Sequence, residues 1–247
     1  MISPLLDIMR QLRDPSDGCD WDKVQTFSTI APYTVEEAYE VADAIERDDM
    51  AALKDELGDL LLQVVFHSQI ATDEGHFGFQ DVVESICDKM QRRHPHIFGT
   101  ANNSPGWEQI KAGERAQAGE TSALDGVALA LPALLRAQKI QKRAARVGFD
   151  WPDIAPVKAK LLEELEEVEQ ANGADEIEEE IGDLLFSAVN LARHYGVDAE
   201  QALSRATRKF SKRFNQVESA VEKDMKDMSI DVLEEEWQRA KAKLAND

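Results

Sequence analysis

The sequence has few of the features that mark secreted, membrane-spanning or disulfide-stabilised proteins. It has two cysteines, Cys19 and Cys87, among 247 residues, too few for a disulfide framework. Residues 1–7 lack the basic and apolar regions of a signal peptide. The longest apolar stretch, residues 127–135, is far shorter than a membrane span and contains Pro132. We therefore expect a cytoplasmic protein with no membrane partner.

Basic residues are also scarce. The chain has 28 lysines and arginines against 48 acidic residues, so its formal net charge is −20. Nucleic acids and anionic membranes would be repelled by such a surface, and we expect neither as a partner. A polyanionic ligand remains compatible if metal ions or a local basic face intervene. The hydrophobic content of 43% is enough for a core and excludes wholesale disorder.

Alternating runs of β-branched residues with hairpin turns are absent. Apolar residues instead recur at spacings of three and four, as on one face of a helix. Two segments show this pattern well: Leu53, Leu57, Leu60, Leu61 and Val64, and then Ile177, Ile181, Leu184, Leu185 and Ala188. The sequence predicts an all-α protein.

The chain contains an internal repeat. Five segments recur in the same order, which is hard to attribute to chance. The pairs are 18–21 with 148–151, 36–40 with 163–167, 56–61 with 180–185, 89–93 with 209–213, and 107–111 with 237–241. Residues 99–123, near the end of the first copy, are rich in turn-forming residues. We predict a tandem duplication of a four- to five-helix unit, with domains at 1–120 and 121–247.

Acidic residues are concentrated in the second copy, with 11 between residues 161 and 183 and no basic one. Such a run usually forms a solvated helix face. Here Glu164 and Glu167 are three residues apart, as are Glu180 and Asp183, and each pair lies beside apolar positions. Four carboxylates converging between two helices need cations or protons to be tolerated. We expect them to bind Mg²⁺, with Mn²⁺ as a possible substitute.

Two further patterns bear on this site. Gly58 and Gly182 lie inside helical patterns, where glycine costs about 1 kcal/mol relative to alanine. Close helix packing and room for an ion or substrate explain them equally well. A di-iron bundle would need a glutamate three positions before a histidine. None of the five histidines has one: His67, His76, His94, His96 and His194.

Cationic residues follow the acidic helices. Arg205, Lys209 and Arg213 are spaced four apart, which gives either a solubilising face or a phosphate-binding stripe. Lys160 lies one turn before Glu164 and could reach the same phosphates. Trp237 could stack on a base, although docking of a terminal helix is the commoner use of such a residue. No glycine-rich phosphate loop is present, which excludes a P-loop mechanism.

These motifs resemble the MazG family of nucleoside triphosphate pyrophosphohydrolases. The resemblance rests on Glu163-Glu164-Leu165-Glu166-Glu167 with Glu180-Ile181-Gly182-Asp183, and on residues 19–26 and 92–98. It implies an all-α homodimer that uses Mg²⁺ to hydrolyse nucleoside triphosphates to monophosphate and pyrophosphate. Asp20 departs from the family's pattern, where proline is expected, but it lies outside the second copy.

The resemblance also implies roles for single residues. The metal ligands would be Glu164, Glu167, Glu180 and Asp183. The substrate contacts would be Lys160, Glu163, Glu179, Lys209, Arg213 and Trp237. The second copy would be the catalytic one. The first keeps Glu37, Glu40, Glu56 and Asp59, a second candidate metal site, together with Lys89 and Arg93. Tyr33 stands there in place of Lys160, and the connector between its acidic pairs is three residues longer.

The expected mechanism is attack of a metal-activated water on the α-phosphorus, with pyrophosphate leaving. Glu163 or Glu179 would accept the proton, and the cationic residues would stabilise charge on the phosphates. A different class of function also fits the composition. A non-enzymatic helical dimer could bind a basic partner protein through its acidic grooves.

Overall fold

A computed structural model describes residues 2–99, 110, 113, 122–221 and 224–244. Within these ranges the regular elements are all helices and no strand occurs, which confirms the all-α prediction. The chain divides into two compact units, Met1–Lys111 and Ala112–Asp247, and each is considered separately below. The boundary predicted between residues 120 and 121 falls outside the described residues.

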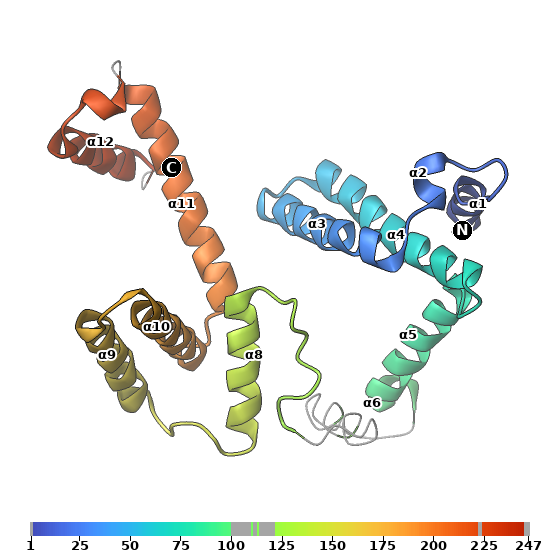
Figure 1. Cartoon of the computed structure of the whole chain (residues 1–247), viewed down its shortest axis with the longest axis horizontal. Helices are drawn as coiled ribbons and strands as arrows, with labels where there is room; N and C mark the ends of the chain where they lie inside the picture. Colours follow the sequence, from blue (N-terminus) through green and yellow to red (C-terminus); the bar gives the residue numbers. More distant parts are fainter. Residues whose placement is uncertain (1, 100–109, 111–112, 114–121, 222–223, 245–247) are drawn as a thin grey trace. The chain divides into compact units, whose positions relative to one another are not determined.

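The first unit is built around a pair of long helices, α3 and α4 (Figure 1). Its helices are α1 (Ser3–Leu12), α2 (Asp20–Lys23), α3 (Phe27–Glu46), α4 (Met50–Asp73), α5 (Phe79–Arg93) and α6 (Pro95–Phe98). The Thr26 side chain caps α3, and the Asp49 side chain caps α4 by accepting a hydrogen bond from the Ala52 amide at 3.0 Å. These caps define where each helix of the pair starts.

The core of the first unit lies between α1, α3 and α4. Met9, Ile30, Val65, Phe66 and Ile70 form one buried cluster. Burial of such side chains stabilises by roughly 1.5–3 kcal/mol each. The cluster lies in the later part of α4, so the acidic residues in its earlier part remain nearer to solvent.

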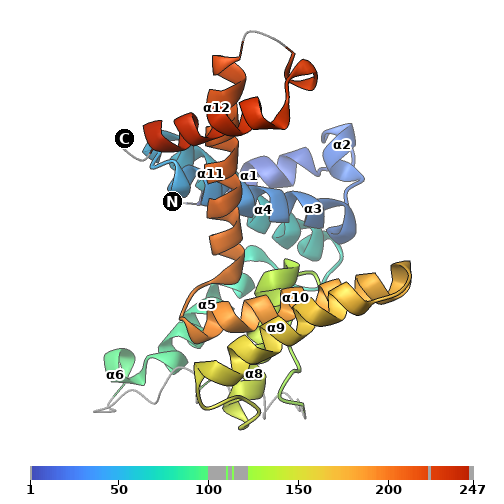
Figure 2. The ribbon, with the colours of Figure 1, turned by 90° about the vertical axis from the view of Figure 1, so that its left-hand side faces the viewer.

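The second unit repeats the helix pair as α9 (Ile154–Gln170) and α10 (Ala174–His194). α8 (Ala133–Arg146) packs against α10, and α11 (Ala199–Ala220) begins beside α8 and α10. Figure 2 shows α11 running away from that end to reach α12 (Ile230–Lys243), with the short 3₁₀ helix η1 (Met225–Asp227) between them. The acidic residues of the second copy therefore lie on a hairpin of two helices, as the repeat predicts.

The connector between the two acidic pairs is three residues longer in the first copy, and the extra residues are helical. Both hairpins have a three-residue turn, residues 47–49 in one and 171–173 in the other. α3 continues six residues past Glu40, whereas α9 continues only three past Glu167. The extra residues therefore lengthen α3 by about one turn and leave the turn itself unchanged.

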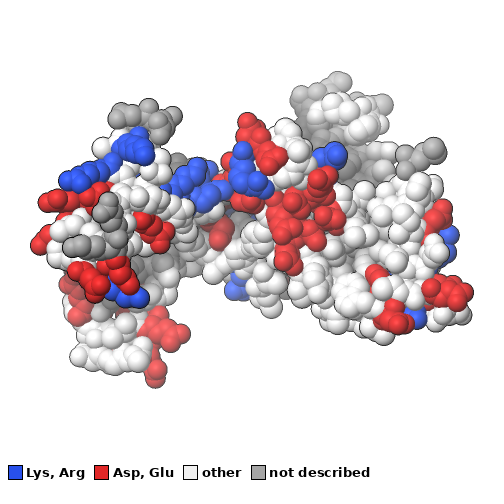
Figure 3. All heavy atoms as spheres, turned by 90° about the horizontal axis from the view of Figure 1, so that it is seen from above, with Lys and Arg blue, Asp and Glu red and all other residues white. Residues whose placement is uncertain are grey.

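The surface charge is uneven. On the face shown in Figure 3, acidic side chains gather into patches and basic side chains form separate groups. Within the described ranges, no helix combines the length and apolarity that crossing a bilayer requires.

Candidate metal centre

Carboxylates from α9 and α10 converge in the second unit. Glu164, Glu180 and Asp183 each offer an oxygen, and these atoms all lie within 4.8 Å of one another. Glu164 is only 5% exposed, and a glutamate is seldom buried so deeply unless it is paired. Glu167 lies outside this trio but hydrogen-bonds to Glu164. The acidic run therefore forms a focused cluster in addition to a solvated face.

Lys160 is the internal counter-ion of the cluster. Its Nζ lies 2.7 Å from Glu163, 3.0 Å from Glu164 and 3.8 Å from Glu167. Hydrogen bonds to Glu163 and Glu164 raise the pKa of Lys160. The ammonium therefore stays charged at neutral pH and compensates the buried Glu164 carboxylate.

One positive charge does not neutralise the whole cluster. The pKa of Glu180 is raised by desolvation, and then by the charges of Glu164 and Asp183. The pKa of Glu167 is raised mainly by its hydrogen bond with Glu164. Both shifts favour the protonated carboxyl, and a bound cation would offset the part that neighbouring carboxylates contribute.

Hard oxygen donors in this arrangement fit a magnesium or manganese ion. Each of the three carboxylates can supply one ligand atom, and Mg²⁺ prefers carboxylate oxygens together with water and substrate phosphates. The excess negative charge is itself an electrostatic reason to bind a cation. The residues present therefore fit the metal that the sequence predicts.

The charge excess predicts how stability depends on pH. Because the pKa of Glu180 is raised on folding, the folded chain retains a proton that the unfolded chain has released. Stability of the metal-free protein should therefore fall as the pH rises above about 4.5, the ordinary glutamate pKa. We expect Glu180→Gln to raise the Tm at pH 7 and to flatten this decline. Thermal unfolding in chelator across a pH series measures both effects.

Glu178→Gln serves as the control, because it removes one negative charge from the exposed side of the same helix. It should change the Tm less than Glu180→Gln. Equal shifts in the two variants would mean that general charge reduction, and not the cluster, sets the pH dependence.

Gly182 lies on α10 between Glu180 and Asp183. A Cβ added at Gly182 would meet no heavy atom within 4 Å, and the same is true at Gly58 in the first unit. Within each unit, close helix packing therefore does not explain these glycines. The open space beside Gly182 is compatible with the second explanation, room for an ion or a substrate.

Gly182→Ala tests this explanation. Alanine should stabilise the helix by up to about 1 kcal/mol, because it has the higher helix propensity and no clash within the unit. We expect turnover to fall by at least about tenfold if the space is used by the ligand. Thermal unfolding and an activity assay on the same sample measure both. Gly58→Ala should stabilise similarly and leave activity unchanged; a loss of activity only in Gly58→Ala would reverse the assignment.

The predicted substrate contacts are placed on two sides of the unit. Glu163 lies in the Lys160 network, and Glu179 is exposed beside Glu180. Lys209 lies at the middle of α11 and Arg213 one turn later, and within the described residues no ion pair joins either one to the cluster. The structure thus places Lys160 and Glu163 at the cluster but does not bring Lys209 and Arg213 to it.

Trp237 docks α12 against α11. Its ring centroid lies 5.1 Å from that of Phe210, and the Arg213 guanidinium lies 5.8 Å above the indole. The Nε of Arg213 is buried without a hydrogen-bond partner. Trp237 therefore docks a terminal helix, which was the alternative to stacking on a base. Its indole also lies beside Arg213, another predicted substrate contact.

The first unit has a related cluster. Glu37, Glu40 and Glu56 offer oxygens within 4.8 Å of one another, and the charge of Asp59 acts on Glu37. The pKa values of Glu37 and Glu56 are raised, in both cases mainly by desolvation. Tyr33, 41% exposed, occupies the position of Lys160. This cluster has the carboxylates, but a tyrosine stands where the second unit has the Lys160 ammonium.

A polar network near the ends of α9 and α10 was missed by motif reasoning. Arg193 donates two hydrogen bonds to Asp150, at 2.8 and 2.5 Å, and His194 lies 3.1 Å from the same carboxylate. The Arg193 and His194 hydrogen bonds lower the pKa of Asp150. The repeat could have indicated Asp150, because this residue belongs to the repeated segment 148–151.

Comparison with known proteins gives consistent matches. Residues 25–98 and 155–218 both match the MazG nucleotide pyrophosphohydrolase domain. The chain is 53% identical to the nucleoside triphosphate pyrophosphohydrolase of Escherichia coli K12, over 97% of each chain. It is 45% identical to the nucleoside triphosphate pyrophosphohydrolase/pyrophosphatase MazG of Thermotoga maritima, over 98% of this chain and 96% of that protein. The uncharacterised YabN of Bacillus subtilis is 41% identical over 97% of this chain and 51% of its own length.

Proposed function

The chain belongs to the MazG family of nucleotide pyrophosphohydrolases, and we propose that it hydrolyses nucleoside triphosphates to nucleoside monophosphates and pyrophosphate in its second unit. The supporting observation is the trio of Glu164, Glu180 and Asp183, with oxygens within 4.8 Å, in a segment that the family domain matches. Three acidic groups, one of them a buried glutamate, suit a divalent cation bridging to phosphates. The related proteins carry the same activity in their names.

The metal proposed is Mg²⁺, with Mn²⁺ as a substitute, held by the trio together with Glu167. When bound, it would neutralise phosphate charge and make water a better nucleophile. Lys160 holds Glu163 and Glu164 in place and presents its charge to the phosphates. Glu163 or Glu179, at the margin of the cluster, accepts the proton of the attacking water.

The attack is proposed to occur at the α-phosphorus. Turnover in ¹⁸O-labelled water, followed by ³¹P NMR of the products, tests this. The account expects monophosphate and pyrophosphate, with the label in the monophosphate. Label in the pyrophosphate would place the attack on the β-phosphorus, and release of orthophosphate would refute the activity.

The second unit is proposed as the catalyst and the first as structural or weakly active, with the division near residue 120. The difference rests on Lys160, because the corresponding residue of the first unit is Tyr33. A tyrosine carries no charge at neutral pH and cannot compensate a buried glutamate or attract a phosphate.

A homodimer is proposed as the working form. Large apolar side chains lie exposed on the acidic helices of both units, where a monomer would leave them in water. They are Leu57, Leu61, Val64, Leu162, Leu165, Ile181 and Leu185. Lys209 and Arg213 would then contact phosphates within the assembly. Light scattering coupled to size exclusion should give twice the chain mass, whereas a monomer at micromolar concentration would contradict this proposal.

The proposed surroundings follow from composition. A net charge of −20 disfavours nucleic-acid and anionic-membrane partners, and two unpaired cysteines fit a reducing cytoplasm. The nucleoside triphosphate is thus the main partner proposed besides a second copy of the chain.

A further inference from the structure

α9 and α10 form the hairpin that carries the carboxylate cluster, and its turn closes only one end of it. The turn at residues 171–173 joins the two helices there, whereas α9 begins and α10 ends at the opposite end. Glu164 lies about 15 Å along α9 from Ile154, its first residue, and Asp183 lies about 15 Å along α10 from Arg193. A contact that joins the open end therefore bears on how the two halves of the cluster face each other.

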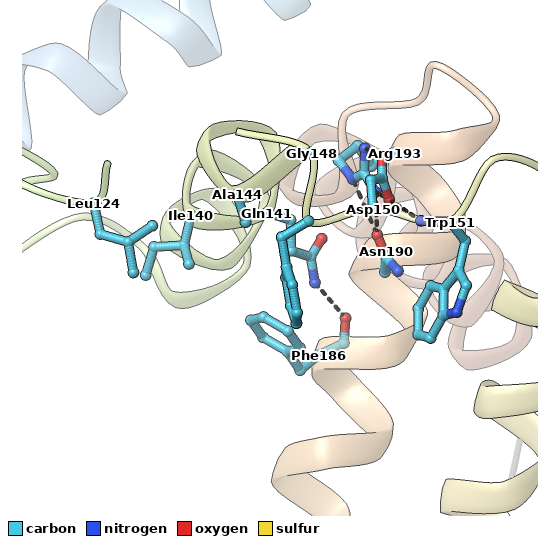
Figure 4. Close-up of a pocket in the computed structure, with 11 residues that line it drawn as sticks. Leu124, Ile140, Gln141, Ala144, Gly148, Asp150, Trp151, Phe186, Asn190 and Arg193 are labelled. Carbon is cyan, nitrogen blue, oxygen red and sulfur yellow. Dashed lines mark hydrogen bonds and ion pairs between the residues drawn. The ribbon is translucent and has the colours of Figure 1, made fainter. Parts of the chain in front are cut away.

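Asp150 and Arg193 make that contact. Arg193 donates one hydrogen bond from Nη1 to Oδ2 of Asp150, at 2.8 Å, and another from Nη2 to Oδ1, at 2.5 Å (Figure 4). Two parallel bonds between a guanidinium and a carboxylate combine charge with a fixed geometry. The side chain of Arg193 is 11% exposed and that of Asp150 is 24% exposed, so water screens the pair only in part. The pair links the segment before α9 to the last turn of α10.

Both members of the pair are also held by other groups. Arg193 donates hydrogen bonds to Oδ1 of Asn190, at 3.0 Å from Nε and 2.7 Å from Nη2, which fixes the guanidinium on α10 (Figure 4). The Asp150 carboxylate accepts a hydrogen bond from the Trp151 amide at 3.0 Å, and the Nε2 atom of His194 lies 3.1 Å from it. Exposed ion pairs lose much of their worth in ordering two long side chains. Here the ordering is shared with several further contacts, so the pair is a firm connection.

A short stretch of chain connects Asp150 to the cluster. Asp153 caps α9 by accepting a hydrogen bond from the Ala155 amide at 3.0 Å, so the helix begins soon after Asp150. Lys160 and Glu164 follow within the first three turns of α9. Because a helix is stiff over this length, a shift at its start moves both of these side chains relative to α10.

The internal repeat shows that this pair is particular to the second unit. Asp20 stands at the position of Asp150, and Gln69 stands at the position of Arg193. In the described part of the first unit, Asp20 instead pairs with Lys23 of its own short helix, at 2.9 Å. The unit proposed as the catalyst is therefore the one that joins its hairpin in this way.

The first unit closes the corresponding end of its hairpin with a residue of α1. Arg13 pairs with Asp73, at the end of α4, at 2.7 Å. It also donates hydrogen bonds to the backbone oxygens of Asp22 and Gln25, which precede α3, at 2.7 and 3.2 Å. The side chain of Arg13 is 8% exposed, close to the value for Arg193. Arg13 thus makes a comparable structural contact in the unit that is not proposed as the catalyst.

We propose that Asp150 is a positioning residue for the metal site in the second unit. Through Arg193 it fixes the start of α9 against the end of α10. Lys160 and Glu164 are thereby held opposite the carboxylates of α10. The effect on turnover rests on the proposed function, whereas the effect on metal binding rests only on the carboxylate cluster.

Metal affinity is the first test, because it needs no turnover. Asp150→Asn and Arg193→Gln each remove one charge of the pair from the full-length chain. Each should weaken Mn²⁺ binding by at least about tenfold in calorimetry without nucleotide, the usual cost of losing a group that orients metal ligands. All proteins compared carry Glu56→Gln, which removes one carboxylate from the cluster of the first unit. The double variant should bind no more weakly than either single variant, because the same contact is lost in all three.

Kinetics give the second readout. We expect kcat at saturating Mg²⁺ to fall by at least about tenfold in Asp150→Asn and Arg193→Gln, with a smaller change in KM, because small displacements of a site act mainly on the reaction step. Arg193→Lys keeps the charge but not the two parallel bonds, so it should lose less than Arg193→Gln. It also carries the test if a neutral variant does not fold. Arg13→Gln is the matched control: it should lower the Tm and leave kcat and Mn²⁺ affinity unchanged.

The possible results separate the positioning role from the proposed function. Weaker Mn²⁺ binding in both neutral variants, with no triphosphate hydrolysed by any form of the chain, would support the positioning role and refute the proposed function. Normal hydrolysis with unchanged kcat and Mn²⁺ affinity in both variants would overturn the positioning role alone. Equal losses in Arg13→Gln would also overturn it, because the cause would then be general destabilisation. Absence of Mn²⁺ binding by the Glu56→Gln parent would overturn both.

Discussion

Asp183→Asn should lower kcat by about 10³-fold while the protein stays folded. Asp183 is exposed, so its amide variant should disturb no packing, yet its carboxylate is one of three that meet within 4.8 Å. Removing one charged ligand weakens the hold on a divalent ion and misplaces the phosphates. Steady-state kinetics with saturating Mg²⁺, together with thermal unfolding, measure the loss of turnover and the survival of the fold.

Asp59→Asn is the matched control, because Asp59 has the same place in the repeated motif of the first unit. It should retain most of the wild-type activity if the second unit is the catalyst. Near-normal turnover by Asp183→Asn would remove the assigned site. A large loss in Asp59→Asn alone would move catalysis to the first unit.

Removal of divalent ions should abolish activity and destabilise the protein. Three carboxylates meet within 4.8 Å, and one ammonium, that of Lys160, lies beside them. A cation that binds only the folded chain stabilises it by about 2.7 kcal/mol at a concentration of one hundred times Kd. We therefore expect chelator to bring activity below detection and to lower the Tm, and added Mg²⁺ to restore both.

Adding Mg²⁺ to the metal-free variants distinguishes binding at the carboxylate cluster from a general effect of the ion on stability. Asp183→Asn should show a smaller rise in Tm on addition of Mg²⁺ than the wild-type chain, because only the carboxylates of the first unit remain intact. Asp59→Asn should keep the rise that comes from the second unit. If Mg²⁺ stabilises Asp183→Asn as much as the wild-type chain, the ion binds elsewhere. Full turnover in the presence of chelator would exclude a metal-dependent reaction.

Much of the fold follows from periodicity and repetition. Apolar residues at spacings of three and four predicted helices where α4 and α10 lie, and the repeated segments predicted two related units. The three-residue difference between the copies was visible in sequence, but its location was not. Turn chemistry alone could not place it in α3, because helix ends depend on packing and capping together.

The site was predictable in part. The spacing within the pairs Glu164/Glu167 and Glu180/Asp183, beside apolar positions, predicted that four carboxylates converge. Three of them, without Glu167, offer oxygens within 4.8 Å of one another. The ion pairs of Lys160 with Glu163 and Glu164 follow from the same rule. The separation of Lys209 and Arg213 from the cluster does not, because the direction in which α11 leaves the helix pair is a tertiary property.

The sequence did not predict that Gln141 of α8 would be buried. Gln141 lies in a helix rich in basic residues and has no neighbour in sequence that marks it as buried. Its unpaired oxygen arises only because α8 packs on α10 and the Phe186 carbonyl takes the amide. The repeated segment 148–151 marked Asp150 as a residue of interest. Its role, accepting two hydrogen bonds from Arg193, is known only from the structure.

The most direct measurement is the anomalous scattering of Mn²⁺ in crystals of this chain grown with a triphosphate whose α,β-bridging oxygen is replaced by a methylene group. The account predicts a peak within ligand distance of the carboxylates of Glu164, Glu180 and Asp183, bridged to the phosphates. A nucleotide bound with the metal elsewhere, or with these three carboxylates turned away from it, would contradict the account.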